Sequence, residues 1–134
     1  MNTTTINPWT WQDQLGFSQG VLVESPARTL YAAGQGPVDG DGALVHEGDV
    51  AAQARTAMDN VEAVLEAAGM TLADVVRYDL YVTDLQGYFV DGGHAEVVKR
   101  FAEARVVPAG GIATQVMALA IPGMQVEVTV IACR

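Results

Sequence analysis

Residues 49–69 read DVAAQARTAMDNVEAVLEAAG. Asp49 is a natural helix N-cap, because its side chain can accept hydrogen bonds from the backbone of the first turn. Gly69 suits the left-handed residue that follows a helix end. Between them, apolar residues recur at the three- and four-residue spacing of a buried helix face: Val50, Ala54, Ala57, Met58, Val61, Val64, Leu65 and Ala68. The stretch predicts an amphipathic helix from Asp49 to Ala68.

The residues after this helix predict a strand and then a second helix. Val75–Val82 is rich in Val, Tyr and Leu, which favour a strand. We expect the second helix over about Asp91–Arg105, with Val97 and Phe101 on its apolar stripe. Pro108 ends this region, because proline cannot continue a helix.

Four other segments have the composition of strands, with Gly- and Pro-containing turns between them. They are Gly20–Val23, Thr29–Ala33, Ile112–Leu119 and Gln125–Ala132. The element order is therefore β-β-α-β-α-β-β, which predicts an α+β fold with two helices on one face of a mixed sheet. Apolar residues on both faces of several strands favour a partner subunit on the other face, with solvent as the alternative.

Length and charge limit the classes of function. The 134 residues correspond to a single domain, residues 1–134, in which residues 1–15 form an N-terminal arm. Only 17% of the residues are charged, which fits either a surface covered by a partner or a core of small side chains. The net charge of −9 repels phosphate backbones, so we expect no nucleic-acid partner.

Cysteine and hydropathy patterns indicate a cytoplasmic protein. Cys133 is the single cysteine, so neither an intrachain disulfide nor a cysteine-based zinc site can form. His46 and His94 have no spacing typical of a metal pair, and we expect neither a metal nor a cofactor. The start of the chain lacks the pattern of a signal peptide, and no apolar run is long enough to span a membrane.

Several short segments, taken in order, resemble the RidA/YjgF family. Each is weakly specific, but together they cover about residues 16 to 133 in the family's order and spacing. They are Gly16-Phe17-Ser18-Gln19, Ala33-Gly34-Gln35 with Pro37, Gln53, Asn60, Leu65 to Gly69, Asp74-Val75-Val76, Tyr81 to Asp84, Val126-Glu127-Val128 and Ile131-Ala132. The resemblance implies a chorismate-mutase-like (YjgF-like) fold, a homotrimer, and small-molecule sites in the clefts between subunits.

The resemblance also indicates where this chain departs from the family. In the deaminating members an arginine follows Pro-Ala after the second helix and binds the substrate carboxylate in bidentate fashion. Here Gly110 stands at that position, followed by Gly111 and Ile112. Phe17 replaces a tyrosine and Ala33 a serine, so two hydroxyls are lost.

The resemblance implies a site built from these positions. The ligand-binding residues would be Phe17, Ala33, Gly34, Gly110, Gly111 and Ile112. Glu127 would orient a water, and His94 would be its acid–base partner with a pKa near 6.5. The alternatives are that Glu127 is a solvated strand residue, that His94 caps or packs its own helix, and that Phe17 belongs to the core.

Two classes of function follow. The first is an enzyme acting on a small metabolite by hydrolysis or tautomerisation at an imine or enamine bond, without standard 2-iminopropanoate deamination. The alternative is a noncatalytic small-molecule-binding module of the same fold. Endoribonuclease activity, sometimes assigned to this family, is disfavoured by the acidic charge.

Overall fold

The computed structural model describes all residues, 1–134. Helix α1, Val50–Ala67, forms where the sequence predicts it. Asp49 caps this helix by accepting the N–H of Ala52 at 3.0 Å, and Gly69 follows its end with a φ of +67°. A single 3-10 turn, η2 (Leu72–Asp74), then leads into strand β4 (Val75–Val82), whose bounds are those predicted from the sequence.

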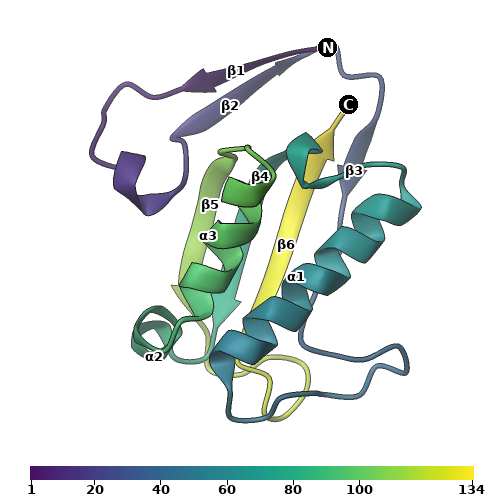
Figure 1. Cartoon of the computed structure of the whole chain (residues 1–134), viewed down its shortest axis with the longest axis vertical. Coiled ribbons are helices and arrows are strands. Elements are labelled where there is room, and N and C mark those ends of the chain that lie inside the picture. Colours follow the sequence, from purple (N-terminus) through teal and green to yellow (C-terminus); the bar gives the residue numbers. More distant parts are fainter.

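A four-stranded sheet forms the centre of the molecule (Figure 1). Its order is β3 (Thr29–Tyr31), β6 (Val126–Cys133), β4 and β5 (Ala109–Gln115). The β4–β5 pair is parallel and the other pairs are antiparallel, so the sheet is mixed. Helices α1 and α3 (Gly93–Glu103) lie on the same face of this sheet (Figure 1), as the sequence predicts.

The second helical region differs from its predicted form. Helix α3 lies within two residues of the predicted bounds of about Asp91–Arg105, and a short helix α2 (Leu85–Val90), which was not predicted, precedes it. Gly92 separates the two with a φ of +88°, a left-handed conformation that an α-helix cannot contain. The second helix also stops earlier than predicted, at Glu103.

The first residues and strand β5 also depart from the predictions. The N-terminal arm contains strand β1 (Asn2–Ile6), which pairs antiparallel with β2 (Gly20–Glu24), and the 3-10 turn η1 (Asp13–Leu15). Strand β1 was missed because all its residues are exposed and mostly threonine, so no apolar alternation marks it. Strand β5 starts three residues before Ile112 and ends at Gln115, because pairing with β4 begins directly after Pro108.

The core lies between the sheet and the two long helices. Strand β6 places Val126, Val128 and Val130 in it, while Glu127, Thr129 and Ile131 point to the opposite face. No helix covers that opposite face (Figure 1). Separately, none of the helices is both long and apolar enough to cross a bilayer.

Candidate functional site

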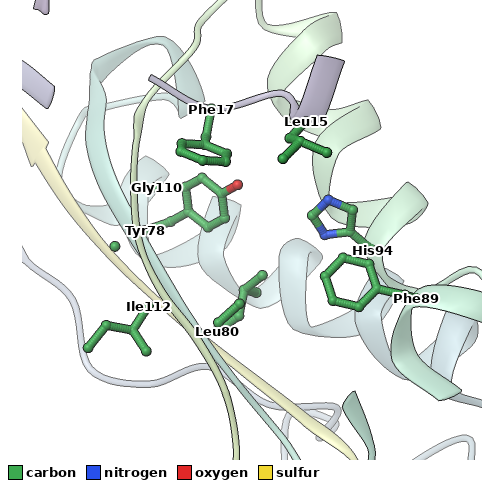
Figure 2. A pocket seen from close by; sticks show the side chains of 10 residues that line it. Leu15, Phe17, Tyr78, Leu80, Phe89, His94, Gly110 and Ile112 are labelled. Atoms are coloured by element: carbon green, nitrogen blue, oxygen red, sulfur yellow. The ribbon is translucent and has the colours of Figure 1, made fainter. Parts of the chain in front are cut away.

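A pocket of about 260 Å³ opens on the helix side of the sheet, at its β5 edge. Leu15 at the end of the N-terminal arm, Phe17 just after it, and residues of β4, β5 and the α2–α3 segment form its walls (Figure 2). They are Leu15, Phe17, Tyr78, Leu80, Phe89, His94, Gly110, Gly111, Ile112 and Ala113. Most of this lining is apolar, and no lysine or arginine belongs to it.

Backbone contacts of Ser18 bring the segment that follows the arm to the pocket. Its N–H donates to the carbonyl of Pro108 at 3.0 Å, and its carbonyl accepts the N–H of Gly110 at 3.2 Å. The buried Ser18 hydroxyl donates to the carbonyl of Val107 at 3.1 Å. These bonds hold the chain beside the start of β5, so Phe17 lies over the pocket and over Gly110 (Figure 2).

His94 lies at the start of α3, on the pocket wall beside Leu15 and Phe89 (Figure 2). Its Nδ1 is 3.4 Å from the hydroxyl of the buried Tyr88, and its ring centroid is 4.7 Å from that of Phe89. Burial lowers the pKa of His94 below 6.5, and the Leu15 backbone only partly opposes this. Within the single chain the pKa of His94 thus lies below the expected value, which favours the neutral ring at pH 7.

Tyr78 is a pocket residue that the sequence analysis missed. It is 4% exposed, and its ring lies beneath that of Phe17 with the hydroxyl directed toward the pocket (Figure 2). Burial raises its pKa, and no hydrogen bond from the chain contributes to that shift. The hydroxyl therefore remains protonated at pH 7 and is available to a ligand. A tyrosine at a core-facing position of β4 was the one signal that could have identified it.

Glu127 lies elsewhere in the single chain. Its side chain points to the uncovered face of the sheet, where it packs on the backbone of Gly34 so closely that a side chain at position 34 would overlap it. Ala33 precedes Gly34 and does not line the pocket. The chain thus brings together Phe17, His94 and the Gly110–Ile112 segment, while Glu127, Ala33 and Gly34 form a second group.

Two residues whose side chains could hold or transfer a proton or an anion, Arg105 and His46, do not line the pocket. Arg105 follows the end of α3, exposed and with a φ of +56°. His46 is exposed in the loop before α1. No three His, Cys, Asp or Glu side chains are placed to hold a metal ion together.

Comparisons with known proteins agree on the family. The family model described as Endoribonuclease L-PSP matches residues 12–134. YyfB of Yersinia pestis, a protein of the conserved Rid family, superposes with a TM-score of 0.81 at 33% identity, covering 100% of both chains. Escherichia coli TdcF with bound serine superposes with a TM-score of 0.68 at 30% identity, covering 88% of this chain and 87% of that one.

Curated relatives match over shorter stretches. The 2-iminobutanoate/2-iminopropanoate deaminase of Salmonella typhimurium is 42% identical over 72 residues, which are 54% of this chain and 53% of that protein. The chain spans about half the length of the first curated relatives it matches. Family membership therefore rests on the model match and on the full-length superposition. The chain belongs to the Rid/YjgF/L-PSP family and has its α+β fold, a mixed sheet with helices.

Proposed function

We propose that this protein binds a small uncharged molecule with an apolar substituent and hydrolyses or tautomerises its imine or enamine bond. The observation that carries the proposal is the lining of the pocket, which is mainly apolar and has no cationic side chain. A 2-imino acid carries a carboxylate, which would lose its hydration there without gaining an ionic partner. We therefore propose that standard 2-iminopropanoate deamination is not its reaction.

The two polar side chains of the pocket suit an uncharged imine. In hydrolysis, water adds to the carbon of the C=N bond, a proton goes to the nitrogen, and the adduct breaks down to a carbonyl compound and ammonia. The hydroxyl of Tyr78 would donate to the imine nitrogen, since its pKa is raised by burial. The neutral ring of His94 would accept a proton from the water, although the Tyr88 hydroxyl already contacts its Nδ1.

We propose further that the working form is a homotrimer whose clefts add Glu127 of a second chain to this pocket. Support comes from the sheet face that no helix covers, where Tyr31 is 76% exposed and Ile131 lies in register with it. Glu127 lies on that face and outside the pocket of its own chain, so pairing with His94 requires a neighbouring subunit. In that position the carboxylate would orient the attacking water.

The test compares two imines that share a phenyl group. A flavin-dependent amine oxidase acting on benzylamine generates the uncharged benzaldimine, and an amino acid oxidase acting on phenylalanine generates 2-imino-3-phenylpropanoate. Semicarbazide forms the same semicarbazone from an imine and from its carbonyl product but reacts faster with the imine, so a lower initial rate of semicarbazone formation with the protein than without it reports faster loss of the imine. We expect faster loss of benzaldimine only. Equal acceleration of both imines would refute the selection against carboxylates, and acceleration of the carboxylated imine alone would refute the whole proposal.

A noncatalytic binding module is the second candidate. The contact between Tyr88 and His94 favours it, because a ring nitrogen engaged by the protein is less available to a substrate. This candidate predicts that benzaldehyde or indole binds, as detected by NMR titration, while neither imine is lost faster than without protein.

A further inference from the structure

Strand β5 contains a bulge where it forms the pocket wall. The parallel register pairs Tyr78 with Gly110 and then Leu80 with Ala113, so β4 advances by two residues while β5 advances by three. The extra residue falls within the Gly111–Ile112 segment, and both residues line the pocket. The shape of this wall therefore depends on what stabilises the bulge.

Asp79 contacts the bulge from the opposite face of the sheet. Its Oδ1 accepts the backbone N–H of Ile112 at 2.7 Å. A side chain at position 111 would overlap the same carboxylate, so the glycine there leaves the space that Asp79 occupies. The absence of a side chain at position 111 is thus explained by the contact with Asp79, without any contact to a ligand.

Arg77 fixes the orientation of this carboxylate. Its Nε donates to Oδ2 of Asp79 at 3.2 Å, and one of its terminal nitrogens donates to Oδ1 at 3.0 Å. The side chain of Asp79 is 14% exposed, while that of Arg77 is 46% exposed. The carboxylate therefore has Arg77 as a bidentate partner, and its Oδ1 also accepts the Ile112 amide.

We infer that Asp79, oriented by Arg77, is a positioning residue that sets the β5 wall of the pocket by bonding the bulged backbone at Ile112. Neither Arg77 nor Asp79 lines the pocket, so their effect on a ligand passes through the backbone. The part of the inference that concerns ligand binding rests on the proposed function. The role of Asp79 in stabilising the bulge can be tested without a ligand.

Two substitutions separate the hydrogen bond from the charge. Asp79→Asn and Asp79→Ala both remove the ion pair with Arg77, but only Asp79→Asn keeps an oxygen that can accept from Ile112. Thr129→Val is the matched control, since Thr129 lies beside Asp79 in register on the same face and its hydroxyl donates to Ala32 instead. Light scattering and thermal unfolding show whether assembly or stability changes in each variant.

The ligand-free measurement is amide hydrogen exchange at Ile112 by NMR. We expect exchange about tenfold faster in Asp79→Ala than in Asp79→Asn, because asparagine keeps an oxygen that can accept the Ile112 N–H and alanine does not; in Thr129→Val it should be unchanged. Equal rates in the alanine and asparagine variants, or no change in either, would overturn the inference.

The second measurement is the affinity for indole, an uncharged aromatic probe, by NMR titration. We expect about a tenfold loss in Asp79→Ala, and less than about threefold in Asp79→Asn and Thr129→Val. If Asp79→Ala accelerates exchange at Ile112 but retains the wild-type affinity, the bulge does not govern the pocket and the inference fails. If the wild-type protein does not bind indole, the proposed ligand class fails, and the exchange rates alone decide the role of Asp79 in the bulge.

Discussion

The ring of Phe17 lies so close to Gly110 that a Cβ atom at position 110 would be 2.8 Å from both Cγ and Cδ2 of the phenylalanine. Because Cγ lies on the Cβ–Cγ axis about which the ring rotates, rotation of the ring leaves this atom in place and does not make room for the new Cβ. Phe17 and Gly110 are therefore coupled: the aromatic ring occupies the place through which a side chain at position 110 would emerge. A substitution at position 110 has to displace Phe17 as well.

We predict that Gly110→Arg lowers the free energy of unfolding by about 1–3 kcal/mol, the usual cost of overpacking. In a Phe17→Ala background the same substitution should cost less, because the ring that it displaces is gone. Denaturant unfolding of the four proteins in this double-mutant cycle measures the difference. Additive costs would contradict the coupling.

Gly40→Arg is the matched control for this cycle. A Cβ at Gly40 meets no atom within 4 Å, so we expect an effect within about 0.5 kcal/mol on the free energy of unfolding.

The contact between Phe17 and position 110 also leads to an expectation for the activity of Gly110→Arg toward 2-imino acids. Gly110→Arg alone should not create a site for 2-imino acids, because Phe17 obstructs the new side chain. If the Gly110→Arg variant that retains Phe17 accelerates the loss of 2-imino-3-phenylpropanoate, this expectation is contradicted.

The pH dependence of stability tests the environment of His94. Its pKa is lowered by burial in the folded state, so between the folded pKa and the ordinary value of 6.5 the unfolded chain binds more protons. The contribution of the neutral His94 ring to the free energy of unfolding is fully present above pH 6.5 and is lost as the pH falls through the pKa of His94 in the folded state. We predict that His94→Phe reduces the loss of stability on acidification from pH 7 to pH 5.

The measurement is denaturant unfolding of wild type and variant at several pH values. His46→Asn is the control, since His46 is exposed and asparagine tolerates its φ of +59°. We expect this control to retain the wild-type profile. A His94→Phe profile parallel to that of wild type would show that burial of the imidazole does not affect stability.

The hydroxyl of Tyr78 provides a third prediction. Tyr78→Phe should weaken indole binding about threefold to tenfold, because one net hydrogen bond is lost, while the fold remains stable. Tyr81→Phe removes a hydroxyl from the other face of the same strand and should leave the affinity unchanged. NMR titration gives both affinities. Unchanged binding in Tyr78→Phe would mean that the hydroxyl does not contact the probe.

The best-predicted elements are those whose apolar period is unambiguous. Helix α1 repeats its apolar residues over five turns with a cap at Asp49, and β6 places a valine at every second position from Val126 to Val130, so local sequence is sufficient for both. Strand β1 could not be predicted in this way, because its threonines are exposed on both sides. Helix α2 was missed because its six residues, Leu85–Val90, span fewer than two turns, too few for an apolar period to mark it.

The candidate site was predictable only where a family pattern marked its residues. Phe17, His94 and Gly110 come together in the pocket, whereas Tyr78 reads as an ordinary core position of β4. The contact of Asp79 with Ile112 joins residues 33 positions apart through a side chain and a bulged backbone. Neither periodicity nor turn chemistry describes such a contact, so it needs the tertiary structure.

The last prediction concerns assembly. The sheet face without helices carries Ile131 in register with Tyr31 on one side and Arg77 on the other. If this face packs against two further copies, light scattering should give about three times 14.1 kDa. Ile131→Lys should then yield folded protein of single-chain mass, because the new ammonium group would lie beside Arg77 and lose hydration in the interface.

Val90→Lys is the control for this substitution, since Val90 is 74% exposed on α2, away from the uncovered face. It should keep the wild-type mass. Circular dichroism of Ile131→Lys should retain the wild-type helix signal, which separates loss of assembly from loss of folding. A wild-type mass of 14.1 kDa at micromolar concentration would contradict the trimer, and with it the participation of Glu127 from a neighbouring chain, because Glu127 does not line the pocket of its own chain.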